Sequence, residues 1–516
     1  MELRRPLAAV GLSMLSTLFL LCGFCGIRLC FVVLFASLFC FLLSLIIKRT
    51  RRGALVPVVF GSVAFSCLVL LLFEGFVFLP TESHCAESAE ISAVVREYAT
   101  ESSDKKRLYL VANLVSVDGN DAKGRVRLSF PAKEWKKGTP ILPEDTRLLE
   151  PGDKVTFTGK LYKIAQGNRS IHNHFKSKGI CLAAYPTQFV TVEKRSVKNL
   201  YTFLMKERKR TVNQILNAFE PETAAVIISV LMGNRERLSS ELQNAFNRSG
   251  TAHLLAVSGL HLSVWIMFIV DFLKKRNALS KMSILVLVCF VFIVMFFASF
   301  SGSVKRAGIM MLMYLSAELL NEQADSLNSL GFSAVCLLCL NPYAAVNASF
   351  LLSFVATLTI ITVAVPISDA VNSRLEEKTH FRFPAFLKSA VICLFISLFV
   401  NLTTLALQIR YFGGVSLVGV LANLALTPVV APLILGSGLY VMFYFLPGVS
   451  TLLFWLSNLS VQYLEKVVLF FASFKYSYIE LDERFILPAA LLSACVYSIS
   501  LLLLNRRERR IEKFSR

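Results

Sequence analysis

The sequence predicts a polytopic α-helical membrane protein. It has about 12 spans, some of them broken, and a small extracytoplasmic β-barrel inserted after the third span. Three observations predict this fold class. Hydrophobic residues fill 55% of the 516 positions and charged residues only 17%, which excludes a soluble enzyme, a disordered scaffold and a simple secreted domain. The apolar residues gather in stretches of about 20, the length of a membrane-crossing helix. One polar region of about 115 residues interrupts these stretches and alternates apolar with polar side chains, as strands do.

The N-terminal region, residues 1–80, contains three predicted spans near 7–26, 27–47 and 55–79. Basic residues precede the first span and follow the second, and the positive-inside rule places both groups in the cytoplasm. The first two spans therefore form a hairpin, and the third carries the chain outward. The formal net charge of +20 has two interpretations. The positive-inside rule explains most of it, but a basic surface also attracts a polyanion.

Residues 81–198 form the predicted extracytoplasmic domain. About five short runs in this region alternate apolar and polar side chains at period two. Turn signals such as Asp118-Gly119-Asn120 separate these runs. Short strands in a region of this size suit a small closed barrel of the OB-like type. The alternating runs are 91–98, 107–117, 125–130, 154–162 and 180–192.

Several side chains of this domain have two interpretations. Cys85 and Cys181 either form a disulfide, which an oxidising compartment permits, or remain free thiols. His172 and His174 are expected in an exposed loop without a metal, because no Cys or Asp pair stands at ligand spacing. Four aromatic residues either stack on the bases of a single strand or fill the barrel core. They are Phe130, Trp135, Tyr162 and Phe175.

The remainder of the chain divides into three regions. Residues 199–250 are expected to form amphipathic helices on the outer membrane surface, 251–505 a second set of membrane helices, and 506–516 a basic cytoplasmic tail. The hydrophobic runs of the second set are 254–273, 282–300, 304–320, 328–345, 349–367, 389–408, 415–445, 452–474 and 485–504.

Polar and charged residues inside apolar runs mark candidate functional positions, because lipid-facing helices have no use for them. His253 and His261 are eight residues apart and share one face of an unbroken helix, with Ser258 between them. They either line a polar pathway or cap a helix where helices pack closely. Lys305 and Arg306 open another span, where two cations oppose the helix dipole. A carboxylate, lipid headgroups or a phosphate-bearing substrate is expected to balance them.

A third segment carries two prolines. Pro428 and Pro432 stand four residues apart, after Asn423, within a long hydrophobic run. Each proline removes a backbone donor, so the run is expected to be a broken or partly re-entrant helix rather than one continuous helix. Broken helices at membrane depth are buried in protein or line a wet cavity.

These segments together resemble the ComEC family of natural-competence proteins, which are inner-membrane DNA-uptake channels. The most specific similarity is Leu231-Met232-Gly233-Asn234-Arg235 through HLLAVSGLHLSVW, which ends at Trp265. Lys305 to Met310, Asn347 to Phe354 and Asn423 to Pro432 are similar to three further family elements. Two positions depart from the family pattern. Ser349 and Leu351 stand where the family has Gly and Gln, so a polar lining group is missing at 351.

The resemblance implies a multi-pass channel component of the bacterial cytoplasmic membrane that translocates single-stranded DNA during natural transformation. It also implies two partners besides membrane lipid: a cytoplasmic helicase-like ATPase and an extracytoplasmic DNA receptor. The residues expected on the DNA path are His253, Ser258, His261, Lys305, Arg306, Ser353, Asn423 and Pro428.

The chain is expected not to be an enzyme, with no catalytic residue, cofactor or metal. It has no Gly-x4-Gly-Lys-Ser/Thr loop, so an ATPase would be a separate subunit. The metallo-β-lactamase-like domain of many family members is not expected, because no His-x-His-x-Asp-His cluster is present. A transporter of another polyanion, such as an envelope polymer, is the alternative function. A membrane protein retained without transport, and a homo-oligomer, also stay open.

Overall fold

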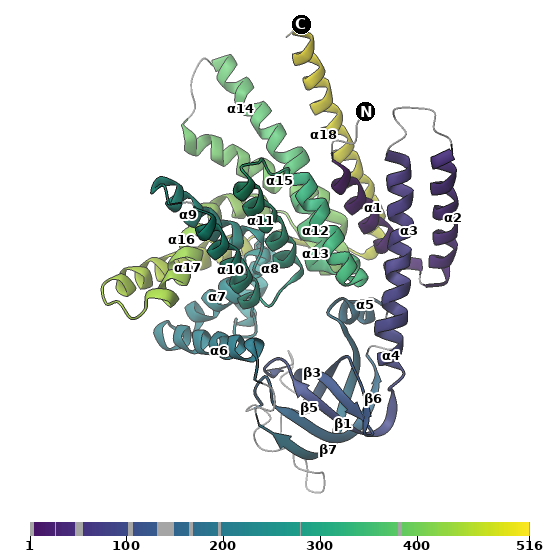
Figure 1. Cartoon of the computed structure of the whole chain (residues 1–516). Helices are drawn as coiled ribbons and strands as arrows, with labels where there is room; N and C mark the ends of the chain where they lie inside the picture. The colour runs from purple at the N-terminus through teal and green to yellow at the C-terminus, as the bar shows by residue number, and fades with distance from the viewer. Residues whose placement is uncertain are drawn as a thin grey trace. The chain divides into compact units, whose positions relative to one another are not determined.

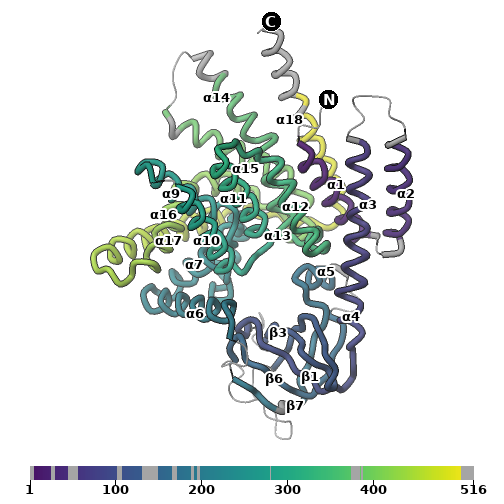
Figure 2. The backbone as a smooth tube through the Cα atoms, viewed as in Figure 1, coloured from purple at the N-terminus to yellow at the C-terminus, as the bar shows by residue number. Residues whose placement is uncertain are grey.

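The computed structural model describes residues 5–25, 27–46, 55–101, 107–131, 149–164, 169–194, 198–278, 280–379 and 384–514 (Figures 1 and 2). The chain divides into two compact units. One comprises residues 1–212 together with 334–347, and the other comprises 213–333 together with 348–516. The first unit thus takes in a short segment from the second half of the sequence.

Three hydrophobic helices begin the first unit, one for each predicted span. α1 (Pro6–Leu20) continues as a π-helical turn, η1 (Leu21–Cys25), and α2 (Ile27–Ile46) follows. α3 (Leu55–Phe73) packs against both α1 and α2. It continues through a second π-helical turn, η2 (Glu74–Phe78), and a short helix, α4 (Leu79–Glu82), directly into the β domain (Figure 1).

Five long strands close into the predicted OB-like barrel. They are β1 (Ala86–Val95), β3 (Arg107–Val117), β5 (Arg125–Pro131), β6 (Lys154–Lys163) and β7 (Ile180–Glu193). The order β1-β6-β7-β5-β3 is closed by pairing of β1 with β3, and only β5 and β7 run parallel. Two short strands, β2 (Thr100–Glu101) and β4 (Asn120–Asp121), pair with β3. Alternate residues fill the interior because successive side chains of a strand point to opposite faces.

Phe130 is one of these interior residues, with 1% of its surface exposed. Of the two interpretations of Phe130, core filling is therefore confirmed and base stacking is wrong, because Phe130 lies on the same inward face of β5 as Leu128 and Val126. Trp135 lies outside the described residues. Tyr162 and Phe175 lie on the barrel surface considered below.

The predicted disulfide between Cys85 and Cys181 is also wrong, since both cysteines are free. Cys85 directly precedes β1, Cys181 belongs to β7, and β6 lies between these strands. Two strand spacings amount to about 9.5 Å, and Cα atoms more than about 7 Å apart cannot be bridged. Burial raises the pKa of the Cys181 thiol to about 12, so this side chain acts as a small apolar group.

The tract around His172 and His174 forms a helix, α5 (Arg169–Ser177), instead of the predicted exposed loop. His172 Nδ1 donates to the Ile164 carbonyl oxygen at 2.8 Å. His174 is exposed, but Asn173 and Lys176 are buried. The partners of these two buried polar groups lie outside the barrel, so the local sequence gives no sign of the helix.

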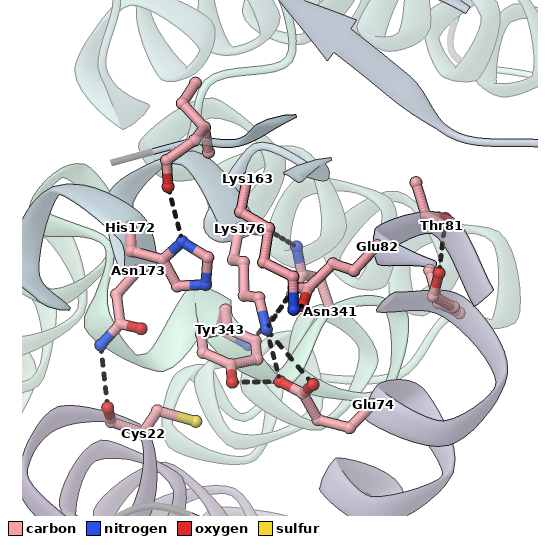
Figure 3. Close-up of polar contacts among 12 residues, drawn as sticks. Cys22, Glu74, Thr81, Glu82, Lys163, His172, Asn173, Lys176, Asn341 and Tyr343 are labelled. Atoms are coloured by element: carbon pink, nitrogen blue, oxygen red, sulfur yellow. Dashed lines mark hydrogen bonds and ion pairs between the residues drawn. The ribbon is translucent and has the colours of Figure 1, made fainter. Parts of the chain in front are cut away.

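Lys176 stands at the centre of a buried ion network (Figure 3). Its Nζ lies 3.0 and 3.2 Å from the two carboxylate oxygens of Glu74 and 3.3 Å from Glu82. Lys163 pairs with Glu82 at 2.7 Å, and the Tyr343 hydroxyl donates to Glu74. The two carboxylates and two ammonium groups cancel in charge, which is the condition for burying charge inside a protein.

The rest of the chain is almost entirely helical. Its elements are α6 (Leu200–Ala218), α7 (Pro221–Met232), α8 (Ser240–Arg248), η4 (Ala252–Leu255), α9 (Gly259–Lys275), α10 (Lys281–Phe297), α11 (Gly302–Leu320), α12 (Ser326–Leu340), η5 (Pro342–Val346), α13 (Ala348–Thr359), η6 (Ile360–Ala364), α14 (Val365–Thr379), α15 (Ala385–Phe412), β8 (Gly414–Ser416), α16 (Gly419–Phe443), α17 (Val449–Ala472), β9 (Tyr478–Glu480), η7 (Glu483–Phe485) and α18 (Ile486–Phe514). Each hydrophobic run predicted between 254 and 504 contains one main helix or continuous helical stretch. The run 254–273 also includes the break before α9, 328–345 includes the break before η5, and 415–445 begins in β8. β8 and β9 pair as a small antiparallel ribbon.

The helices support the predicted multi-pass membrane fold. Among the described residues, six helical stretches are long and apolar enough to cross a membrane. They are Pro6–Phe24, Val56–Glu82, Ala348–Ser373, Leu387–Phe412, Gly419–Phe443 and Glu483–Ser500. Four shorter apolar helices accompany them, so the total of about 12 spans stays a prediction.

One helix of the region 199–250 differs from the amphipathic surface helices expected there. α7 has nine of its 12 residues buried, Thr223 to Val230 and Met232. Its sequence is apolar around the whole circumference, and a helix of that kind is buried rather than laid on a surface.

The ion network predicts a large loss of stability when Lys176 is removed. Lys176→Met leaves the buried Glu74 carboxylate without a cation and is expected to lower the free energy of unfolding by about 3–5 kcal/mol. Thermal or chemical unfolding of the full chain in detergent measures this. The matched control is Lys160→Met, which removes an exposed lysine paired with exposed Glu87 and is expected to leave the midpoint unchanged. Equal losses in both variants would contradict a structural role for the buried network.

Candidate functional site

The first predicted site segment is interrupted before α9. Residues 252–255 form the 3-10 turn η4, and Ser258 is extended with φ −122° and ψ 176°, so that α9 begins at Gly259. His253 and His261 therefore do not share the face of one helix, as the sequence suggested. The His253 side chain is exposed, whereas His261 has only 3% of its surface exposed.

Ser258 and His261 form a capping box at the start of α9. The Ser258 backbone N–H donates to His261 Nδ1 at 3.1 Å, and Ser258 Oγ lies 3.0 Å from the same nitrogen. Because Nδ1 accepts, a neutral imidazole carries its proton on Nε2. His261 Nε2 is buried and has no hydrogen-bond partner in the described part of the chain. The residue thus caps α9 and keeps one buried N–H donor unused.

Arg306 on α11 is the central residue of the candidate site. Its side chain is buried, with 5% of its surface exposed. Nε donates to Ser353 Oγ at 3.1 Å, and Nη1 lies 2.9 Å from Met310 Sδ. No carboxylate pairs with this guanidinium among the described residues. Of the three expected sources of balancing charge, a carboxylate is thus not found among the described residues.

The starts of three helices meet around Arg306. At Gly259, the first residue of α9, an added Cβ would lie 3.1 Å from both Arg306 Nη2 and Ala307 Cβ, so a side chain there would require its neighbours to shift by a few tenths of an ångström. Ser303 in the first turn of α11 donates to the Ser349 carbonyl oxygen in the first turn of α13 at 2.9 Å. Ser301 caps the backbone of α11, and its buried Oγ has no partner within the described residues.

Positive charge dominates the surroundings of Arg306. Helix N-termini carry partial positive charge and free N–H groups. Three of them lie around the Arg306 guanidinium, and no carboxylate of the described residues balances it. A buried charge without compensation is unfavourable by several kcal/mol. Guanidinium groups and helix N-termini are both groups that anions bind, so the chemistry of this arrangement would suit an anion.

Other residues near Arg306 differ in burial and contacts. Lys305 is the residue before Arg306 on α11 and is half-buried. Ser349, one of the two departures from the family pattern, supplies the polar link to Ser303. Leu351, the other departure, is buried with 5% exposed. Sequence reasoning missed the approach of Gly259 to Arg306 and the Ser303–Ser349 link, since a small residue indicates close packing but not which residue lies opposite.

The predicted break at Pro428 is wrong, because α16 is one continuous helix that includes Pro428 and Pro432. A proline ring disturbs the carbonyl groups of the preceding turn. Thr427 Oγ1 donates to the Asn423 carbonyl oxygen at 2.7 Å, and the Tyr463 hydroxyl donates to that of Ala425 at 3.2 Å. Side-chain donors thus reach two carbonyls of the turn before Pro428, and polar neighbours of this kind help membrane helices to accommodate proline.

A second candidate surface lies on the barrel of the first unit. The rings of Tyr162 and Tyr185 stack with centroids 5.6 Å apart and planes 10° from parallel. Arg107 lies over Tyr185 at 5.3 Å, and Arg127 lies between Tyr109 at 3.6 Å and Phe175 at 4.9 Å. Neither arginine pairs with a carboxylate in the described residues. Burial, with help from Tyr185, raises the pKa of Tyr162 to about 12, so its ring stays neutral.

Fold and sites together define a multi-pass membrane protein with an OB-like barrel and a buried arginine that no carboxylate of the described residues balances. The family model described as competence protein matches residues 230–509, more than half of the chain. The chain belongs to this family, the ComEC family that its motifs resemble. Among the described residues no group of His, Cys, Asp and Glu side chains could hold a metal ion.

Two relatives extend the comparison. ComE operon protein 3 of Bacillus subtilis (strain 168) is 24% identical over 221 residues, which cover 43% of this chain and 26% of that protein. The chain thus matches about a quarter of the length of this relative. An uncharacterized protein of Aquifex aeolicus (strain VF5) is 28% identical over 380 residues, which cover 71% of this chain and 82% of the relative. No solved structure matches the chain.

The uncompensated arginine predicts an unusual stability change. Arg306→Met removes a buried cation that no carboxylate balances, so it is expected to raise the free energy of unfolding, by about 1–4 kcal/mol. Unfolding of the purified chain in detergent measures this. Arg235→Met is the matched control, because Arg235 Nη2 donates to the Ala252 carbonyl oxygen at 2.9 Å and its loss is expected to destabilise. If both variants lose stability, the Arg306 side chain stabilises the fold through its packing contacts.

Proposed function

We propose that this protein is a channel component that moves single-stranded DNA across the cytoplasmic membrane during natural transformation. One observation carries the proposal: Arg306 is buried among three helix starts, and no carboxylate of the described residues balances it. A DNA phosphodiester is a singly charged anion whose oxygens suit guanidinium and helix N–H donors. Membership of the competence family supports this choice of anion.

The barrel is the proposed receiving surface. OB-type barrels bind oligonucleotides on the face of their second and third strands, which correspond here to β3 and β5. Tyr109 lies on β3 and Arg127 on β5, and the stacked pair Tyr162 and Tyr185 adds flat aromatic surface. Single strands bind to such combinations of cations and stacking platforms. The aromatic rings favour DNA over the alternative cargo, an envelope polymer without bases.

Translocation requires a second arrangement of the helices. Arg306 is only 5% exposed, so α9, α11 and α13 have to separate before a strand reaches it. The polar contacts that would open are Ser303 with Ser349 and Arg306 with Ser353. Apolar packing between α9 and α11, where Leu262 and Val304 belong to one buried cluster, would also have to separate. A strand that enters would replace these hydrogen bonds with bonds to phosphate. Such an exchange of partners is a low-barrier way to open a closed site.

The proposal assigns the energy and the hydrolytic chemistry to partners. The chain acts as a conduit and not as an enzyme. A cytoplasmic helicase-like ATPase would pull the strand, and an extracytoplasmic receptor would deliver it to the barrel. The sequence lacks a phosphate-binding Gly-x4-Gly-Lys-Ser/Thr loop, which is consistent with a separate motor.

Arg306→Glu tests the proposal directly. It places a carboxylate where the strand's phosphates would bind, so it is expected to abolish entry of labelled DNA into the cytoplasm. The measurement is uptake in a deletion strain that carries the variant, with membrane abundance unchanged. Arg237→Glu, an exposed arginine of the same unit, serves as the matched control and should import DNA normally. Wild-type uptake by Arg306→Glu would remove this residue from the path.

The barrel face predicts two separable effects on binding of a single-stranded oligonucleotide. Tyr185→Ala removes a stacking ring and is expected to weaken binding by about 1–3 kcal/mol at any salt concentration. Arg127→Gln removes a phosphate contact and is expected to reduce the slope of log affinity against log salt by about 0.7. Fluorescence anisotropy with the full chain in detergent measures both. Arg210→Gln, an exposed residue paired with Glu207, is the control that should change neither.

A further inference from the structure

Helix α5 has an inner and an outer face, because residues three and four positions apart lie on the same side of a helix. His172, Asn173 and Lys176 form the inner face. Asn173 Nδ2 donates to the Cys22 carbonyl oxygen at 2.9 Å, and Lys176 Nζ lies 3.0 Å from a carboxylate oxygen of Glu74 (Figure 3). These bonds hold the helix in one position within the first unit.

The outer face of α5 consists of Ile171, His174 and Phe175, and Lys178 directly follows the helix. Ile171, His174 and Lys178 are exposed. Arg125 Nη1 donates to the Lys178 carbonyl oxygen at 2.9 Å, which fixes the end of α5 beside strand β5. The exposed side chains are therefore carried by a backbone that is held on both sides.

The outer face of α5 adjoins the aromatic and cationic surface of the barrel. Phe175 packs with Val111 of β3 and Tyr162 of β6 against a small apolar cluster of the strands. Its ring lies 4.9 Å from the Arg127 guanidinium, and the His174 ring meets it edge-on with centroids 5.6 Å apart. Phe175 thus connects a cation of β5 with the exposed histidine of α5.

Three basic side chains, Arg127, His174 and Lys178, are neighbours at this place. None of them forms an ion pair with a carboxylate in the described part of the chain, although exposed Glu97 lies close enough to act on Lys178. Loss of contact with water, and then the charges of Lys178 and Arg127, lower the pKa of His174 below its ordinary value. The imidazole is therefore neutral near pH 7 and becomes a third cation only in mild acid.

We propose that Arg127, His174 and Lys178 form a phosphate-binding site of the barrel, and that His174 takes up a proton when the site is filled. This inference rests on the proposed function, because the ligand is a phosphodiester of the single strand that the barrel receives. A phosphate beside the imidazole favours its charged form, and by linkage the proton strengthens the binding of phosphate equally. The stacking rings next to the site favour a strand with bases over a free phosphate.

His174 is the group that makes this site sensitive to pH. The other charged or titratable side chains of the surface come from β3, β5, β6, β7 and the segment after β1. Of these side-chain types, only histidine ordinarily changes its charge between about pH 5 and pH 8. They are Arg107, Tyr109, Arg125, Arg127, Tyr162, Lys178, Tyr185 and Glu97.

The pH dependence of strand binding tests the site. Fluorescence anisotropy of the full chain in detergent would use a mixed-sequence single-stranded oligonucleotide whose dye does not titrate in this range. The affinity of the wild-type chain is expected to rise roughly tenfold between about pH 7.5 and pH 5.5, the gain from one charge-assisted hydrogen bond. The slope of log affinity against log salt is expected to steepen by about 0.7 over the same interval, because one more cation contacts phosphate.

Two substitutions of His174 separate its charge from any structural role. His174→Gln cannot take up a proton, so it is expected to bind like wild type at about pH 7.5 and to gain nothing in acid. His174→Lys is charged throughout, so it is expected to bind at about pH 7.5 as tightly as wild type does at pH 5.5. The control is His84→Gln, at a half-buried histidine before β1, which should keep the full response to pH.

The possible results distinguish this site from the proposed function. A wild-type response to pH in His174→Gln would overturn the proposal, and so would His174→Lys binding no more tightly than wild type at about pH 7.5. Strong binding that is independent of pH in the wild-type chain would remove the proton-linked site and leave the receiving surface standing. If the wild-type chain binds no oligonucleotide at either pH, the receiving surface itself fails, and this site fails with it.

Discussion

Burying charge is the constraint on which the rest of this structure depends. In a protein interior a charged side chain has to be paired, or its burial lowers stability. The chain meets this constraint in two opposite ways. Lys176 is surrounded by Glu74, Glu82 and an aromatic ring and contributes to a closed, neutral network. Among the described residues, the hydrogen-bond partners of Arg306 are a hydroxyl and a thioether. The first arrangement stabilises the fold, and the second leaves a buried cation without a carboxylate partner in the described part of the chain.

Hydrophobic runs and alternating runs were enough to predict the helices and the five barrel strands, because length and period report directly on burial. The segments around Ser258, His261 and Arg306 stood out for a similar reason, as polar groups in apolar surroundings. Ser353 was found only through the family resemblance. The helix α5 and the continuous α16 escaped prediction, and for Cys85 and Cys181 the sequence left a disulfide and free thiols open. Each depends on a partner far away in sequence, such as Tyr463 for α16 or the intervening strand β6 for the cysteines.

In the first unit, irregular helical turns occur where α5 of the barrel domain contacts the hydrophobic helices. The π-helical turn η1 offers the Cys22 carbonyl to Asn173, and η2 presents Glu74 to Lys176. The 3-10 turn η5 contributes Tyr343 to the same network. Such departures from the α-helix redirect side chains and carbonyls, and they are frequent at functional positions. Here these turns provide the carbonyl, carboxylate and hydroxyl groups that surround α5, the short helix of the barrel domain.

Gly259 has a consequence for what kind of molecule the arginine site can distinguish. Since glycine brings the backbone itself against the guanidinium, the groups on offer there are main-chain N–H bonds and one delocalised cation. In the proposed function these groups would bind phosphate, and contacts to phosphate carry no sequence information. A strand of any sequence would therefore pass such a site equally well.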